Sequence, residues 1–203
     1  GIIEEIHSAT KSKLLSFSSG GFSGDYNQGI KEVFRSLVNN IVEEPRDIKP
    51  YTVNIIGPTI DSFNNVSDLA ELERMLMLLG AQVNTVFTCK TNVRDIKNLA
   101  MASLNLVTRD TGLEAAKMLK ERYGIPYYYG LPFGVRGSVE WMNDVAGMLG
   151  LSLSRKILAE EIGKYGYSIL ELVNFLQNLD HLRVVISCPL DYSIGLKRLM
   201  QDE

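Results

Sequence analysis

The stretch that decides the fold runs from Ser103 to Gly150 and reads SLNLVTRDTGLEAAKMLKERYGIPYYYGLPFGVRGSVEWMNDVAGMLG. It contains two units in which a short apolar run, typical of a buried strand, leads into apolar residues at helical spacing. The first strand is followed by Thr108, Arg109 and Asp110, and the second by the glycine-rich loop 130–137. Ligands of open α/β sheets bind outside the carboxyl ends of the strands, so these positions are the first candidates for a functional site.

The same alternation extends over the rest of the chain. The apolar patterns predict strands at residues 13–18, 51–57, 82–87, 104–107, 126–129 and 182–188. Helices are expected at about residues 25–42, 67–80, 91–99, 111–124 and 138–150, with caps at Ser67, Thr91 and Thr111. Strict alternation predicts a three-layer α/β/α fold with a parallel, Rossmann-like sheet that helices cover on both faces.

Residues 151–181 are expected to form one long helix. Its apolar residues follow an alternating spacing of four and three, which gives a continuous seam: Leu158, Ile162, Tyr165, Ile169, Leu172, Leu176 and Leu179. Gly163 and Gly166 weaken such a helix by about 1 kcal/mol each, so packing against a neighbour must hold it. We interpret the helix as a brace between domains, with a dimerising coiled coil as the alternative.

The length, composition and charge of the chain limit the classes of function that it can have. With 203 residues, 45% of them hydrophobic, the chain can bury one sizeable core. A formal charge of -3 without a basic stripe argues against nucleic acid as a partner, and the apolar runs are too short to cross a membrane. Cys89 and Cys188 lie far apart, without the spacing of a disulfide framework or a self-contained metal site. We expect a cytoplasmic protein.

Both ends suggest a piece of a larger protein. The sequence opens at Gly1 without methionine or a signal-like segment. Near the other end, the expected strand 182–188 is followed by only one short helix, which cannot cover both faces of a strand. We therefore expect a further domain after it.

Common catalytic motifs are missing or incomplete. Gly24, Gly29 and Lys31 imitate a phosphate-binding loop, but the lysine comes one residue late and no Ser or Thr follows it. We interpret these glycines as a tight strand-to-helix turn. The sequence has no GxGxxG for dinucleotide binding and no GxSxG, and His7 and His181 lie away from the strand ends, which argues against serine hydrolase chemistry.

Two single residues remain as candidates. Cys89 follows the strand that ends at Phe87, a suitable place for a cofactor contact, although a lone thiol is more often a small buried apolar side chain. Arg109 places a permanent cation at the end of a buried strand, which suits an anionic ligand, a cluster or a partner carboxylate. The alternative is an exposed arginine paired with Asp110 or Glu114.

The order of several segments resembles the nitrogenase component 1 family. These segments are GGFSG, VNIIG, a leucine-striped helix, LGAQVNTVF, SLNLV and YGIPYYYGLPFGVRGSVEWMNDVAGMLG, spread over about residues 14–188. The family includes the α and β chains of the molybdenum–iron protein, cofactor assembly scaffolds and dark-operative protochlorophyllide reductase subunits. The resemblance implies the tail of a first α/β domain at 1–45, a complete middle domain at 51–150, a linking helix at 151–181 and the start of a third domain at 182–203.

The resemblance also implies a cofactor and partners. Family members work as paired homologous subunits, hold a metal cluster or a tetrapyrrole at domain and subunit boundaries, and receive electrons from a separate iron–sulfur ATPase. An iron–sulfur or related cluster is thus implied for the full-length complex, and none is expected in this fragment. No catalytic residue or metal ligand is assigned. The positions expected to line the cofactor cavity are Gly21, Phe22, Gly24, Cys89, Thr108 and Arg109.

One departure from the family pattern narrows the function. In α-type chains a cysteine after the strand that matches SLNLV holds the catalytic cofactor, whereas Thr108 and Arg109 stand there in this sequence. A guanidinium cannot ligate iron, which argues against a nitrogen-reducing α chain. We expect a fragment of a nitrogenase-like oxidoreductase subunit, inactive alone, that forms one wall of a metal-cluster or tetrapyrrole cavity for electron transfer. The alternatives are a non-catalytic cofactor assembly scaffold and a ligand-binding α/β module without a redox role.

Overall fold

A single parallel sheet organises the molecule. The structure, a computed structural model, describes residues 2–17, 24–177 and 183–202. The sheet has the strand order β2-β1-β3-β4, with every neighbouring pair parallel. Its strands are β1 (Thr52–Ile56), β2 (Gln82–Phe87), β3 (Leu104–Val107) and β4 (Tyr127–Tyr129). The predicted α/β fold with a parallel sheet is thereby confirmed.

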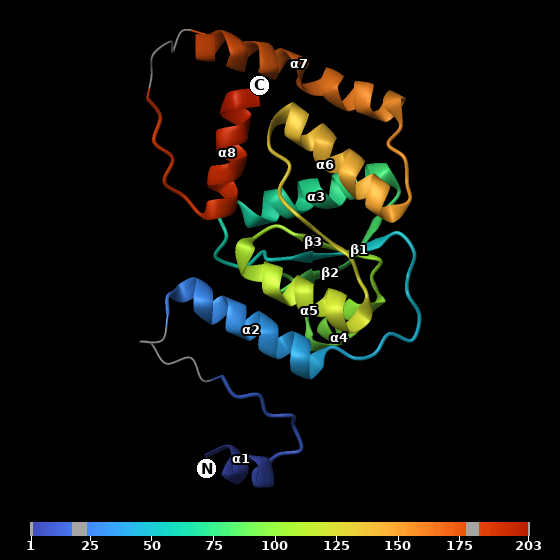
Figure 1. Ribbon diagram of the computed structural model, residues 1–203, viewed down its shortest axis with the longest axis vertical. Helices are drawn as coiled ribbons and strands as arrows, with labels where there is room; N and C mark the ends of the chain where they lie inside the picture. The colour runs from blue at the N-terminus through green and yellow to red at the C-terminus, as the bar shows by residue number, and fades with distance from the viewer. Residues whose placement is uncertain (1, 18–23, 178–182, 203) are drawn as a thin grey trace.

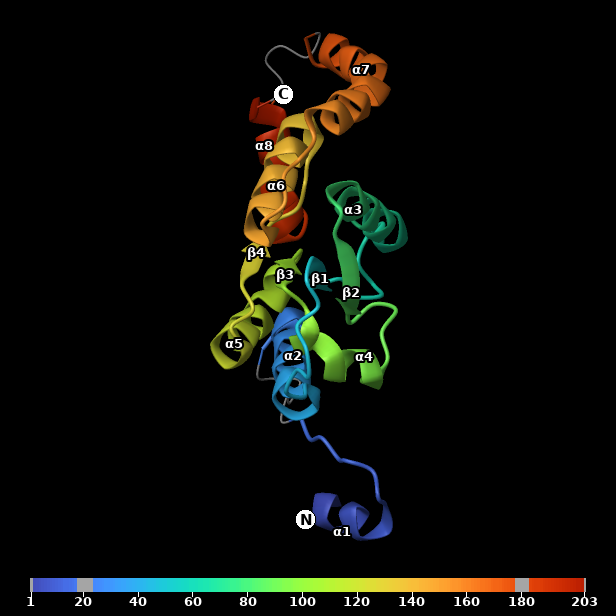
Figure 2. The ribbon, with the colours of Figure 1, turned by 90° about the vertical axis from the view of Figure 1, so that its right-hand side faces the viewer.

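Helices cover both faces of the sheet and make three layers (Figure 1, Figure 2). One face packs against α3 (Asn65–Leu79) and α6 (Gly134–Leu149). The other face packs against α2 (Tyr26–Ile41), α4 (Val93–Lys97) and α5 (Leu113–Tyr123). Short 3-10 turns at Asn98–Met101 (η1) and Asp110–Gly112 (η2) complete the connections. Each face therefore has its own apolar core, as a sheet between two helical layers requires.

Three further helices lie outside these layers. α7 (Arg155–Gln177) lies beyond α3 and α6, and Arg74 of α3 forms an ion pair of 2.6 Å with Glu161 of α7. α8 (Leu190–Asp202) packs beside α6, and α1 (Ile2–Ala9) lies apart from the rest in both views. Of the helices in the described ranges, none has the length and apolarity needed to span a membrane.

The central strands are buried throughout, and a row of asparagines crosses them. Every residue of β1 and β3 is buried, as expected for strands covered on both faces. Asn84 Nδ2 on β2 donates to Asn54 Oδ1 on β1 at 2.8 Å, and Asn54 Nδ2 donates to Asn105 Oδ1 on β3 at 2.8 Å. Asn54 Nδ2 also donates to the carbonyl of Leu99 in η1. We call Asn84, Asn54 and Asn105 the asparagine row.

Two predicted strands are wrong for the residues that the structure describes. Residues 13–17 and 183–187 form no strand, while residue 18 and residue 182 lie outside the described part. Val184 and Val185 are exposed, the latter at 91%. An apolar run becomes a strand only where the edge of another strand is available to it, and neither segment joins the sheet.

Several helix starts also differ from the prediction. α4 is capped by Asn92, which forms a capping box with Asp95, and Thr91 does not cap it. The box expected from Thr111 does not form because η2 precedes α5, and α6 begins at Gly134, before Ser138. The long helix is present as α7, and its seam residues Leu158, Ile162 and Tyr165 line a groove shared with α3 and α6. The side chains of the remaining seam residues lie outside the description: Ile169, Leu172, Leu176 and Leu179.

Candidate functional site

The carboxyl ends of β1 and β3 approach each other closely. Gly57, the residue after β1, has a φ of +122°, which L side chains rarely adopt. A Cβ at Gly57 would lie 2.8 Å from both Cβ and N of Arg109, the second residue after β3. The absence of a side chain at Gly57 therefore lets the backbone of Arg109 come close to the end of β1.

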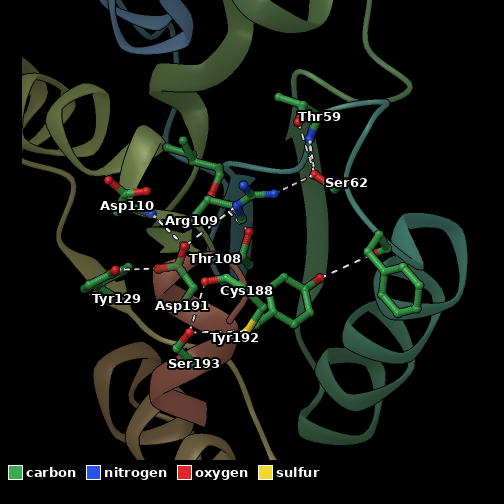
Figure 3. Close-up of polar contacts among 12 residues, drawn as sticks. Thr59, Ser62, Thr108, Arg109, Asp110, Tyr129, Cys188, Asp191, Tyr192 and Ser193 are labelled. Atoms are coloured by element: carbon green, nitrogen blue, oxygen red, sulfur yellow. Dashed lines mark hydrogen bonds and ion pairs between the residues drawn. The ribbon is translucent and has the colours of Figure 1, made fainter. Parts of the chain in front are cut away.

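Arg109 is largely buried and is held from two sides. Its side chain is 14% exposed, and Nη1 donates to Ser62 Oγ at 3.0 Å (Figure 3). Its Nε lies 3.7 Å from Asp191 Oδ2 and has no hydrogen-bond partner among the described residues. The alternative of an exposed arginine paired with a neighbour is wrong, since Asp110 pairs with Lys31 and Glu114 with Arg35.

Asp191, in the first turn of α8, brings a buried carboxylate to the same place. Only 8% exposed, it accepts hydrogen bonds from the backbone N of Asp110 at 3.2 Å and from the hydroxyl of Tyr129. Burial, followed by the hydrogen bond to Asp191, raises the pKa of Tyr129, so its hydroxyl stays protonated and donates. The sequence pattern did not single out this aspartate as a site residue, because its contacts lie far away along the chain.

The next residue, Tyr192, fixes α8 against the other side of the sheet edge. Its hydroxyl, which has one proton, donates to Asp68 Oδ2 at 3.0 Å and has the carbonyl of Phe63 as a second acceptor at 3.3 Å. Its ring meets Phe133 edge-on, with centroids 5.9 Å apart. Burial, followed by the Asp68 carboxylate, raises the pKa of Tyr192 to about 12. α8 is thus seated by polar contacts as well as by packing.

The other predicted positions gather at the same edge but not in one cavity. The Thr108 hydroxyl donates to the carbonyl of Ile56 at 3.3 Å, and Cys89 packs half-buried against the core while its Sγ accepts from Asn65 Nδ2 at 2.9 Å. Asn65, Thr108 and Arg109 line a cavity of about 20 Å³, which has room for about one water molecule. This space cannot hold a cluster or a macrocycle.

The predicted glycine turn is described only at its end. Gly21 and Phe22 lie outside the described residues, and Gly24 is exposed just before α2. Asp25 caps that helix by accepting from the backbone N of Gln28 at 2.9 Å. Tyr26, the first residue of α2, donates to Asp61 in the loop after β1 at 2.7 Å. Gly24 therefore lies near the carboxyl edge of the sheet.

A larger hollow of about 300 Å³ adjoins the polar cluster, between the end of β4, α6 and α8. Tyr129 and Asp191 form part of its wall. Its other main lining residues are aromatic, aliphatic or charged: Tyr128, Leu131, Phe133, Ile194, Leu199, Glu140, Asp144 and Arg198. Sequence reasoning missed this hollow because α8 was assigned to another domain.

The described residues do not provide a ligand set for a metal cluster. Nowhere in the described ranges do three His, Cys, Asp or Glu side chains converge as they would around a metal ion. The thiol of Cys89 is engaged with Asn65, and the exposed Cys188 is paired with Ser193. An iron–sulfur cluster requires several thiolates at one point, so this part of the molecule does not fit such a group.

Comparisons with known proteins agree on one family. Residues 1–203 match the family described as nitrogenase component 1 type oxidoreductase. A light-independent protochlorophyllide reductase chain of Chlorobium phaeobacteroides is 30% identical over 71% of this chain, and that of Zygnema circumcarinatum is 38% identical over 54%. These alignments cover 27% and 20% of the two relatives, so the chain spans about a quarter of their length. A solved structure, nitrogenase Cp1 at pH 5, matches 74% of this chain and 31% of its own, with a TM-score of 0.63 and 27% identity.

Proposed function

The chain belongs to the nitrogenase component 1 type oxidoreductase family, and on this premise we propose that its sheet forms one wall of a cofactor cavity in a nitrogenase-like subunit. Arg109 carries the proposal, because it holds a buried guanidinium at the strand end with one N–H unpaired among the described residues. A cation in such a place stabilises negative charge on a neighbouring group. A metal cluster held by other parts of the complex would supply the electron-transfer chemistry, and a bound tetrapyrrole would accept the electrons.

In this proposal the chain orients the cofactor and does not ligate it. The described residues lack a convergent ligand set, so the ligands come from other parts of the subunit or from a homologous partner subunit. The wall consists of Thr108 and Arg109 at the end of β3, Cys89 after β2 and the glycine turn 21–24. Residues 51–150 form the middle domain, 151–181 link it to the next, and 1–45 and 182–203 belong to the flanking domains.

We further propose a tetrapyrrole as the bound molecule and an iron–sulfur ATPase as the electron donor. The relatives named as light-independent protochlorophyllide reductase favour a macrocycle over a small gas. A macrocycle also agrees with the guanidinium at a position where an iron-ligating cysteine is absent.

The test is to produce the longer subunit with its homologous partner, add the reductase, and measure iron content and protochlorophyllide reduction. Arg109→Lys keeps the charge but loses the planar fork, so we expect turnover to fall about tenfold or more at unchanged iron content. Arg94→Ala, at an exposed arginine of α4, should change neither. Full turnover in Arg109→Ala would overturn the role of Arg109. If the complex binds iron but reduces no substrate, the result would favour a cofactor assembly scaffold over a catalytic subunit.

A further inference from the structure

Three hydrogen-bond donors converge on the carboxylate of Asp191. They are the hydroxyl of Tyr129, the backbone N–H of Asp110 at 3.2 Å and, at 3.7 Å, Nε of Arg109 (Figure 3). We propose that these three groups form a binding site for the carboxylate of a small ligand, and that Asp191 occupies it as an internal substitute. We call the three donors the carboxylate seat.

The chemistry of the seat selects a carboxylate. Each of its groups donates, and a guanidinium together with a backbone N–H and a hydroxyl satisfies the acceptor-only oxygens of a carboxylate. The Tyr129 hydroxyl is protonated at neutral pH, as tyrosine hydroxyls ordinarily are, and therefore donates. The oxygens of Asp191 show where the oxygens of a ligand would bind.

Asp191 fills the seat incompletely. Nε of Arg109 lies 3.7 Å from the nearer carboxylate oxygen, beyond hydrogen-bond distance, and is buried without a partner among the described residues. A buried donor left unpaired costs free energy. Asp191 cannot move closer to this donor, because its backbone is part of α8. A free carboxylate has no such restraint, so it can move closer and satisfy the remaining donor.

Two of the three donors, those of Arg109 and Asp110, belong to residues that are anchored independently of Asp191. Arg109 is fixed through Nη1 to Ser62 and lies against Gly57, while the side chain of Asp110 pairs with Lys31 at 2.9 Å. The seat is therefore preorganised, which lowers the cost of binding.

The volume and the lining of the adjoining hollow of about 300 Å³ indicate what the rest of the ligand is like. Its aromatic and aliphatic wall, with Tyr128, Phe133 and Leu199, suits an apolar body, and its volume lies at the lower end for small-molecule sites. Glu140, Asp144 and Arg198 add charged groups of both signs to the same lining. The ligand class is thus a small carboxylate with an apolar body, whose binding displaces Asp191 and the start of α8.

This inference goes beyond the proposed function, because it places a second, small ligand at the same edge of the sheet. Its test involves neither metal nor turnover, so the two can fail separately. If only the cofactor cavity exists, the reduction assay will be positive and the carboxylate-binding assay negative. If only the carboxylate seat exists, the binding assay alone will be positive.

The experiment uses Asp191→Ala, which removes the carboxylate from the seat. Acetate or phenylacetate is then added, and chloride at equal ionic strength is the control. Amide hydrogen exchange at Asp110 and in α8 is the readout. We expect Asp191→Ala to speed exchange at Asp110 about tenfold or more, and millimolar acetate to restore the protection, more strongly for phenylacetate. Wild type should respond little, because its seat is occupied.

Two variants keep the test decisive. Asp191→Ala combined with Arg109→Gln should lose the response to acetate, because the cation is gone. If Asp191→Ala does not fold, Asp191→Asn keeps the shape of the occupant without its charge, and phenylacetate should then displace α8 and speed its exchange. Equal effects of acetate and chloride on the variant that folds would overturn the proposal.

Discussion

At the scale of single residues, Gly57 and Arg109 share a space that admits one side chain. A Cβ on Gly57 would lie 2.8 Å from two atoms of Arg109, and the φ of +122° is itself unfavourable for any other residue. The polar cluster at the strand ends thus depends on a residue that takes no part in its hydrogen bonds. Such a requirement follows from backbone geometry and not from side-chain chemistry.

Gly57→Ala tests this dependence. We expect the free energy of unfolding to fall by about 2 kcal/mol or more, because the new methyl group adds a clash to a strained backbone. Gly29→Ala is the matched control: Gly29 lies in α2 with nothing within 4 Å of its Cβ position, so alanine should stabilise by about 0.5–1 kcal/mol. Urea unfolding of both variants measures the difference. A neutral Gly57→Ala would contradict the close approach.

Tyr192 gives the stability a dependence on alkaline pH. Its pKa rises from 10.0 to about 12 on folding, so the folded state keeps a proton that the unfolded state loses between these values. Stability is therefore fully present below pH 10 and decreases as the pH rises from about 10 to about 12. Tyr192→Phe keeps the ring and removes the hydroxyl, and the decrease should be smaller in that variant. Urea unfolding at several alkaline pH values checks this, and parallel curves for both proteins would count against it.

The site was predictable at this scale only in part. The end of a buried strand identified Arg109 as a cation near the expected crevice, and the structure places it there. Its partners were not predictable, since Ser62 and Asp191 lie 47 positions before it and at the start of α8. Periodicity describes which face of an element is apolar, but polar contacts between distant segments leave no periodic signal.

At the scale of elements, the asparagine row joins three strands inside an otherwise apolar layer. Asn54 is 0% exposed and links β2, β3 and η1 through its side-chain amide. Buried polar groups are costly when unpaired, so the row favours one register of the strands over its neighbours. The sequence showed these asparagines within apolar runs without indicating that they would meet.

Asn54→Ala should therefore cost much more than the loss of one side chain. It leaves the buried Asn105 Oδ1 without its donor and removes one acceptor of Asn84 Nδ2, which also donates to the carbonyl of Asn98. We expect about 2 kcal/mol or more of lost stability. Asn40→Ala is the control, because Asn40 is exposed in α2 and donates only to Ser36 within its own helix, so a change within about 0.5 kcal/mol is expected. Urea unfolding compares the two, and equal losses would show that the row adds nothing.

The elements themselves were largely predictable, and the exceptions share one cause. Continuous apolar runs correctly indicated the four paired strands. The expected helix ends near residues 80 and 124 are also correct, since α3 and α5 end at Gly80 and Gly124. Residues 13–17 and 183–187 have similar patterns but pair with nothing in the described chain. A pattern gives the capacity to form a strand, whereas a strand also needs a neighbouring edge.

At the scale of the whole molecule, the unpaired segment 183–187 bears on the proposed domain organisation. It lies between α7 and α8, both of which pack outside the three layers (Figure 1). In the proposed arrangement these residues begin the parallel sheet of a third domain, which would bury Val185. In this chain the same valine is 91% exposed. One substitution therefore has opposite consequences in the two contexts.

Val185→Lys in the 203-residue chain should change the free energy of unfolding by no more than about 0.5 kcal/mol, because the side chain already faces solvent. Val53→Lys, at a fully buried position of β1, is the control that should prevent folding. In the longer subunit, Val185→Lys should instead prevent the third domain from folding, since a lysine would be buried without a partner. Urea unfolding tests the first chain, and soluble yield with limited proteolysis tests the second. If Val185→Lys leaves the longer subunit folded, as it should leave the 203-residue chain, residues 182–188 are not a buried strand of a third domain.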